Sequence, residues 1–292
     1  MTDKEIQLKI AQAYQAACMD ELMALKPGNV HIFADGHGMT VQDFMKSAEA
    51  SVSAISEPCS IGERIFNAVQ ATQQAVGCNT NLGIILLVAP LVQAAYGYFE
   101  QKSDTKYAHL TPLQHYQQCL QQVLSDLTLQ DAQLCAKAIV LAKPAGLGQS
   151  EKHDVNDEVN VNLQTLMRTA ENRDLIAYQY THQFETIFLG FTHYQAAMQR
   201  WQNTAWATTA LYLQLLANKL DSHIVRKHGE VIATQAMLEA KVHAATFQAA
   251  DNPKLIQKQL LVWDAALKAQ NINPGTTADL TVATLFMRLI VD

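Results

Sequence analysis

Apolar residues recur at helical spacing along nearly the whole chain. Near the start, Ile6, Ile10 and Ala13 fall on one face of residues 3–25, because positions three or four apart are neighbours on a helix. No run shows the strict alternation that is typical of a strand, and no repeat of about 30–45 residues is present. The pattern predicts an all-α fold, a single-domain multi-helix bundle over residues 1–292. The predicted helices span residues 3–25, 40–55, 61–76, 82–99, 112–124, 129–142, 159–170, 175–197, 204–220, 253–270 and 277–290.

One stretch is apolar on every face. Residues 82–92 contain no charged side chain, and a helix that is apolar all round has to be buried. The uncharged run continues to residue 99 and is long enough to be weighed as a membrane span, but Pro90 and Gln93 interrupt it. We therefore expect a buried central helix with a kink at Pro90, and no membrane partner.

Three small polar residues directly precede this central helix. Asn79, Thr80 and Asn81 have side-chain oxygens that accept hydrogen bonds from the unpaired N–H groups at a helix start. One interpretation is an ordinary capped core helix. The other is a helix N-terminus that opens into a polar pocket, where its N–H groups and its dipole would attract phosphate.

The composition fits extensive buried helical surface and argues against some partners. Hydrophobic residues make up 49% of the 292 residues and charged residues only 16%, against a typical charged content of about 25%. The formal net charge of −6 argues against a nucleic-acid binder, which would carry a basic stripe. The five cysteines form no C-x-x-C pair and the N-terminus has no apolar signal segment, so we expect reduced thiols and a cytoplasmic location.

Polar loops between the helices carry residues suited to binding or catalysis. In residues 26–39, Lys26 is a cation of the type that binds phosphate, and Gly28 lets backbone approach a ligand closely. A helix C-terminus with a lysine favoured by the dipole is the alternative. In residues 143–157, Asp154 and neighbouring carboxylates suit Mg²⁺, although a solvated acidic loop would look the same.

Two further loops lie in the C-terminal third of the chain. Residues 221–229 combine one carboxylate, Asp221, with cations and imidazoles that include Arg226 and His228. This set suits an anion and metal site, and a solvent-facing helix junction is the alternative. Residues 273–279 place hydroxyl and N–H groups where they could cradle phosphate, or they form a plain N-cap.

Taken in order, these segments resemble the triphosphoribosyl-dephospho-CoA synthase family. The resemblance spans residues 21–286 and rests on an ordered set of short motifs, each of them weak alone. The motifs are Lys26-Pro27-Gly28 with the later His37, Asn79-Thr80-Asn81-Leu82-Gly83, Asp221 with Arg226 and Gly229, and Pro274-Gly275 with Ala278-Asp279-Leu280. We expect the segments that carry them to converge on one cavity of the bundle.

The resemblance implies a transferase that uses ATP and Mg²⁺. Members of the family join the ribose of ATP, with its triphosphate intact, to the ribose 2′-hydroxyl of dephospho-CoA and release adenine. The product is the precursor of the prosthetic group on the acyl carrier subunit of citrate lyase or malonate decarboxylase. The implied partners are these small molecules, and the assembly state is left open, a homo-oligomer included.

The implied reaction gives the polar residues predicted roles. Displacement of adenine from ribose C1 passes through an oxocarbenium-like state, so the site must hold the triphosphate, protonate adenine and deprotonate the hydroxyl. Asp279 is the preferred base, because it stands at a loop-to-helix junction where the dipole keeps a carboxylate ionised, and Glu21 is the second choice. His37 is the candidate acid near adenine, or else a structural histidine. Asp154 and Asp221 are the predicted Mg²⁺ ligands. The predicted substrate- and phosphate-binding residues are Lys26, Gly28, Asn29, Asn79, Thr80, Asn81, Arg226, His228, Gly275, Thr276 and Thr277.

The chain also departs from the family pattern. It has His31 where relatives tend to carry Asp, Gly38 in a stretch that lacks its Asp, and Thr276 in place of the second glycine of Pro-Gly-Gly; residues 226–229 replace Arg-Gly-Gly. These changes concern the acceptor more than the nucleotide chemistry. One alternative is a nucleotide- or pterin-related biosynthetic enzyme of tetrahydromethanopterin-linked one-carbon metabolism, where similar divergent relatives occur, or a bundle that binds a pterin, a nucleotide or a partner protein without catalysis. The other is a Mg²⁺-dependent hydrolase of an N-riboside.

Overall fold

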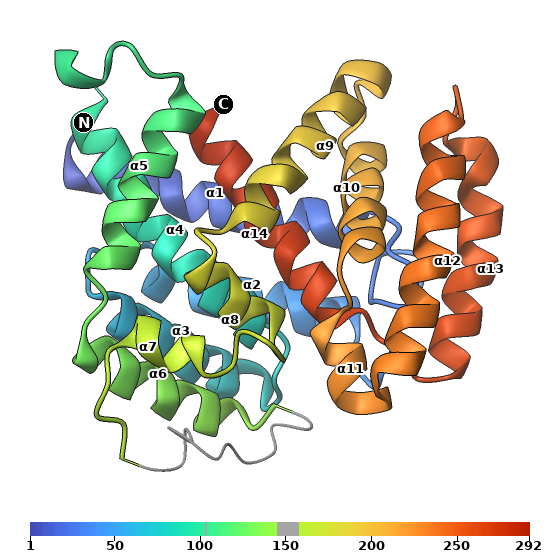
Figure 1. Ribbon diagram of the computed structural model, residues 1–292, viewed down its shortest axis with the longest axis horizontal. Coiled ribbons are helices and arrows are strands. Elements are labelled where there is room, and N and C mark those ends of the chain that lie inside the picture. Colours follow the sequence, from blue (N-terminus) through green and yellow to red (C-terminus); the bar gives the residue numbers. More distant parts are fainter. Residues whose placement is uncertain (103, 145–157) are drawn as a thin grey trace.

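The protein is a bundle of helices (Figure 1). The computed structural model describes residues 1–102, 104–144 and 158–292. Within these ranges no strand occurs, and two isolated bridges lie in the loop after the first helix. The all-α prediction is confirmed. In chain order the elements are α1 (Asp3–Met23), α2 (Val41–Ser56), α3 (Ile61–Val76), α4 (Leu82–Gln101), the 3₁₀ turn η1 (Thr105–Tyr107), α5 (Pro112–Ser125), α6 (Leu129–Ala142), α7 (Leu163–Arg168), α8 (Leu175–Thr181), α9 (Glu185–Trp201), α10 (Thr204–Asn218), α11 (Ser222–His228), α12 (Glu230–Ala249), α13 (Lys254–Ala269) and α14 (Gly275–Val291).

Two apolar helices, α4 and α14, form the centre of the bundle. Both are buried along most of their length, and α14 packs against α1, α4, α9 and α10. The predicted buried central helix is therefore present as α4, with Pro90 inside it. Among the described helices α4 alone is long and apolar enough to cross a membrane, and 83% of the apolar window is buried within the protein. Burial of that kind is typical of a core helix.

Two parts of the chain differ from the helices that the sequence predicts. The predicted helix over residues 175–197 divides into α8 and α9, because Gln183 and Phe184 adopt left-handed backbone conformations with φ of 52° and 59°. The Phe184 side chain is fully buried, and burial of an aromatic ring offsets the cost of a positive φ. Residues 230–249, outside the predicted helices, form α12 and pack against α10.

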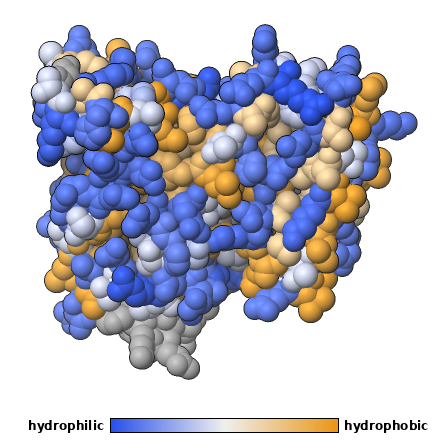
Figure 2. Space-filling view, turned by 45° about the horizontal axis from the view of Figure 1, so that its top comes forward, coloured by the Kyte–Doolittle hydropathy of each residue, from blue (hydrophilic) through white to orange (hydrophobic). Residues whose placement is uncertain are grey.

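Helices α12 and α13 form an outer layer on one side of the molecule (Figure 1). Together with α10 and α11 they enclose a second hydrophobic cluster, separate from the main core. Figure 2 shows apolar surface on the right of the molecule. The exposed large apolar residues of α12 and α13 are Val231, Leu238, Val242, Leu255 and Val262. The inward side of α13 matters for the site, because it holds the loop after α1.

Candidate active site

A cavity of about 400 Å³ opens where several helix ends meet. The cavity lies near the N-termini of α4, α8 and α14, beside α11 and the C-terminal end of α1. Residues from each segment that carries a family motif line it, as expected. A second cavity, of about 450 Å³ between α12 and α13, is lined by none of the predicted site residues. The first cavity is lined by Glu21, Asn29, His37, Met39, Phe44, Asn79, Thr80, Leu82, Gly83, Ile84, Leu86, Ile139, Lys143, Pro144, Asp174, Ile176, His223, Arg226, Lys227, Asn273, Gly275, Thr276, Ala278 and Asp279.

Asp279 reaches the cavity from inside α14 and rests against α4. A Cβ atom on Gly83 would lie only 2.0 Å from Asp279 Oδ2, so the glycine leaves the space that the carboxyl group occupies. Burial raises the pKa of Asp279 well above its ordinary value of 3.8, and the nearby carboxylates, led by that of Asp221, raise it further. The helix begins at Gly275 and Asp279 lies beyond its first turn. Burial and like charge oppose the expectation that the dipole keeps Asp279 ionised, since the dipole acts mainly within the first turn of a helix.

Glu21 lies near the end of α1 and is buried beside Lys26. The Lys26 ammonium contacts Glu21 Oε1 and lies 3.3 Å from Asn29 Oδ1, while Asn29 Nδ2 donates to Asn273 Oδ1 at 2.8 Å. Burial raises the pKa of Glu21, and the Lys26 cation partly offsets this. Glu21 lines the cavity but Lys26 does not. The Lys26 ammonium is thus paired with Glu21 and does not face the cavity.

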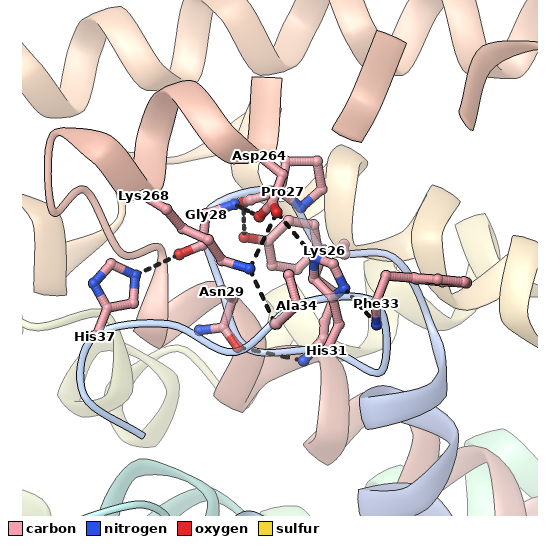
Figure 3. Close-up of polar contacts among 11 residues, drawn as sticks. Lys26, Pro27, Gly28, Asn29, His31, Phe33, Ala34, His37, Asp264 and Lys268 are labelled. Atoms are coloured by element: carbon pink, nitrogen blue, oxygen red, sulfur yellow. Dashed lines mark hydrogen bonds and ion pairs between the residues drawn. The ribbon is translucent and has the colours of Figure 1, made fainter. Parts of the chain in front are cut away.

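The loop after α1 is anchored on α13 (Figure 3). Asp264 Oδ1 accepts from the Gly28 N–H at 2.8 Å, and its Oδ2 lies 3.1 Å from Lys268 Nζ and 3.3 Å from His31 Nε2. Gly28 has a φ of 84°, and a Cβ there would lie 2.8 Å from Pro274 Cδ. Gly28 therefore allows close packing of two loops, and it does not line the cavity.

His37 lines the cavity, and its ring is held by a hydrogen bond to Gly28 (Figure 3). Its Nε2 donates to the carbonyl of Gly28 at 2.8 Å, and because a carbonyl only accepts, Nε2 carries the hydrogen. Burial lowers the pKa of His37, so the ring is neutral at physiological pH. In this arrangement His37 has no proton to give to adenine, and its fixed orientation fits the structural role that was the alternative.

Cationic side chains gather at the more exposed part of the cavity. We call Lys143, Arg226 and Lys227 the cationic rim. Arg226 Nη1 lies 3.4 Å from Asp174 Oδ2, and both side chains are partly exposed. Burial, followed by the charges of Arg226 and Lys227, lowers the pKa of His223 to about 4. The rim thus carries fixed positive charge beside a neutral imidazole, a set that favours an anionic ligand.

We call the two acidic side chains deeper in the cavity, Glu21 and Asp279, the carboxylate floor. The start of α4 also contributes, because Asn79 and Thr80 line the cavity. Asn79 Oδ1 accepts from the Leu82 N–H at 3.1 Å. The Asn79 side chain therefore caps α4 and also faces the cavity. The capped core helix and the helix N-terminus that opens into a polar pocket are thus compatible interpretations of this turn.

Several predicted site residues lie behind the cavity wall. Asp221 accepts four hydrogen bonds, from the N–H groups of His223 and Ile224 and from the N–H and hydroxyl of Thr277. His228 Nε2 pairs with the carbonyl of Asn271 at 2.9 Å. Within the described ranges, no three His, Cys, Asp or Glu residues are grouped to hold a metal ion. The predicted residues that do not line the cavity are Lys26, Gly28, Asn81, Asp221, His228 and Thr277, and Asp154 falls outside the described residues.

The cavity also contains polar residues that the sequence prediction missed. Asp174 is the N-cap of α8, so in the sequence it looks like an ordinary cap. His223 and Lys227 belong to the cluster 221–229, where Arg226 and His228 were the predicted binding residues. The charge cluster was thus a valid signal, but the rotation of α11 decides which of its members face the cavity.

An all-helical bundle with one cavity lined by both cationic and carboxyl side chains is typical of an enzyme that binds an anionic small molecule. The sequence model of the ATP:dephospho-CoA triphosphoribosyl transferase family matches residues 7–292. The chain belongs to this family, and it is a transferase of the triphosphoribosyl-dephospho-CoA synthase type.

Comparison with solved structures supports the same fold. The crystal structure of a proposed triphosphoribosyl-dephospho-CoA synthase from Archaeoglobus fulgidus is similar with a TM-score of 0.63 and 21% sequence identity. The similarity covers 84% of this chain and 97% of that chain. A search of curated protein sequences finds no match.

Proposed function

We propose that the cavity holds ATP with its triphosphate at the cationic rim and its ribose C1 near the carboxylate floor. The observation that carries this orientation is that one cavity is lined by the exposed cations Lys143 and Lys227 and by Glu21 and Asp279 from two long helices. Phosphate oxygens are best held by arginine and lysine. Buried carboxyl groups with raised pKa values suit proton transfer at the reacting centre.

The reaction exchanges one bond at ribose C1 for another. The bond from C1 to adenine breaks, and a bond forms from C1 to the acceptor hydroxyl oxygen, with the triphosphate carried along unchanged. Because the transition state resembles an oxocarbenium ion, carboxylates near C1 would stabilise the positive charge that develops there. The carboxylate floor, Glu21 and Asp279, is the part of the cavity suited to this task.

We propose dephospho-CoA as the acceptor. Of the departures from the family pattern, His31 is buried against Asp264 on the far side of the loop, and Gly38 does not line the cavity. Thr276 does line it, where it pairs with Ser222 Oγ at 3.0 Å. His31 and Gly38 thus do not line the cavity, whereas Thr276 and Lys227, which belongs to the changed stretch 226–229, do. The family acceptor is supported by the match of the family model to residues 7–292.

Mg²⁺ would accompany the triphosphate as its counterion. The described residues form no metal site for it, because both carboxylate oxygens of Asp221 already accept hydrogen bonds, four in all.

The test is acceptor-dependent release of adenine. The purified protein is incubated with Mg-ATP, with or without dephospho-CoA, and adenine and product are followed by chromatography and mass spectrometry. We expect adenine only when dephospho-CoA is present, in equal amount with a product that carries the added triphosphoribosyl mass. Phosphopantetheine, which lacks the acceptor ribose, is the control and should support no release. Equal release without an acceptor would indicate a hydrolase and contradict the proposal.

A further inference from the structure

We propose that the two carboxyl groups of the floor divide the proton transfers. Asp279 donates a proton to the departing adenine, and Glu21, held ionised by Lys26, accepts the proton of the attacking hydroxyl. This division rests on the proposed function. It reverses the role that the sequence suggests for Asp279, and it gives Lys26 a positioning role in place of phosphate binding.

The surroundings of Asp279 favour its protonated form. Among the described residues its carboxyl group makes no hydrogen bond or ion pair, and it lies against the apolar start of α4 at Gly83. The charged groups that act on it are three carboxylates from three other elements, Asp221, Glu21 and Asp174, and two cations, Arg226 and Lys26. A further negative charge there is opposed by burial and by like charge, so Asp279 keeps its proton to higher pH than an exposed carboxyl group does.

The surroundings of Glu21 differ in one decisive respect. Its Oε1 is in direct contact with the Lys26 ammonium, which is itself fully buried and also bound to Asn29. An ammonium at hydrogen-bond distance stabilises the carboxylate form. The pKa of Glu21 is raised less than that of Asp279, because Lys26 offsets part of the effect of burial. Glu21 therefore loses its proton at lower pH than Asp279, the order that separates a base from an acid within one cavity.

The proton balance closes over one turnover. As the bond between C1 and adenine breaks, its electron pair goes to adenine, and the Asp279 proton is transferred to a ring nitrogen of that base. As the bond from C1 to the acceptor oxygen forms, the hydroxyl proton moves to Glu21. Return of that proton from Glu21 to Asp279, directly or through water, restores the starting state. The net result is transfer of the hydroxyl proton to adenine.

A substrate that needs no acid separates the two roles. A 7-methylated analogue of ATP carries a positively charged base, which leaves as a neutral molecule without protonation. We expect Asp279→Asn to lower kcat with ATP by roughly 10²–10⁴-fold, the typical contribution of a general acid, and to lower it far less with the methylated analogue. Glu21→Gln should lower kcat with both substrates to a similar extent, because the acceptor hydroxyl still has to lose its proton. A blank without enzyme corrects for spontaneous loss of the methylated base.

Lys26 is tested through the pH profile. If Lys26 holds Glu21 ionised, Lys26→Met should move the acidic limb of the kcat/KM profile to higher pH and leave the KM for ATP nearly unchanged. A lysine that held phosphate would instead raise that KM and leave the limb in place. Because a buried carboxylate left unpaired destabilises the fold, the double variant Lys26→Met with Glu21→Gln serves as a second test. It should fold and be no less active than Glu21→Gln alone.

Each outcome bears on one statement. Equal losses of Asp279→Asn on ATP and on the methylated analogue, in a folded variant, would overturn the division of roles while leaving the transferase activity in place. Rescue of Glu21→Gln by the methylated analogue would do the same. A wild-type enzyme that releases no adenine with any acceptor would overturn the proposed function and this division together.

Discussion

The carboxylate floor and the cationic rim belong to one cavity but are built in different ways. Glu21 and Asp279 belong to regular helices, where Glu21 is buried and Asp279 is partly buried. Lys143 is the C-cap of α6, and Arg226 and Lys227 lie on the seven-residue helix α11, where side chains reach solvent. Burial strengthens electrostatic effects and shifts pKa values, whereas water screens exposed charges. The floor should therefore control proton transfer, and the rim should control how tightly the triphosphate is held.

The floor is most easily disturbed from α4, at Gly83. A Cβ atom there would lie 2.0 Å from Asp279 Oδ2 and 2.5 Å from its Cγ, so the carboxyl group has to move. A misplacement of about 1 Å in an active site can lower the rate by roughly 10²-fold. We expect Gly83→Ala to lower kcat by about that factor and to change the KM for ATP little, as measured by steady-state release of adenine.

Gly97→Ala is the matched control in the same helix. The nearest atom to a Cβ at Gly97 is 3.8 Å away, which is ordinary contact, and alanine is favoured over glycine within a helix by about 0.5–1 kcal/mol. This variant should keep its kcat and unfold at the same or a slightly higher temperature. Equal loss of activity in both variants would show that α4 itself is sensitive and would count against the role of Asp279.

The raised pKa of Asp279 should also make the free energy of unfolding depend on pH. Between the ordinary pKa of 3.8 and the raised pKa of folded Asp279, the unfolded chain has released a proton that the folded chain keeps. In that window the free energy of unfolding falls as the pH rises, by at most about 1.4 kcal/mol per pH unit for one proton. Asp279→Asn lacks this proton, so its stability relative to the wild type should increase with pH through the window. Denaturant unfolding at a series of pH values measures the difference, and a difference independent of pH would contradict the raised pKa.

The rim should respond more weakly and in a different parameter. Lys227 is exposed and lines the cavity, so solvent screens its contact with phosphate and its loss should cost about 1 kcal/mol. We expect Lys227→Gln to raise the KM for ATP by roughly five-fold and to leave kcat nearly unchanged, with a smaller effect at high salt. Lys258→Gln, on α13 and away from the cavity, removes the same charge and should change neither parameter. A fall in kcat at Lys227 would place this residue with the floor.

Much of the fold could be predicted from local pattern, and the exceptions depend on packing. Helical spacing of apolar residues predicted the bundle, because a helix with one apolar face packs that face against its neighbours. The burial of α4 was predicted because this helix is apolar on every face. The break between α8 and α9 could not be predicted in this way. It depends on Phe184 burying its ring in the core, a contact with distant residues that compensates for an unfavourable local conformation.

The order of motifs along the sequence was sufficient to identify the family and to name the segments that meet at the cavity. The role of each polar residue was decided only by the tertiary structure. Lys26 and Asp221 have the residue types expected of a phosphate ligand and a metal ligand, but the fold surrounds one with Glu21 and Asn29 and fills the other with donors from α11 and α14. The protonation state of Asp279 is likewise set by burial and by carboxylates from three other elements. Residue type and order are local properties of the chain, whereas pKa values and hydrogen-bond partners depend on which distant groups the folded chain brings within reach.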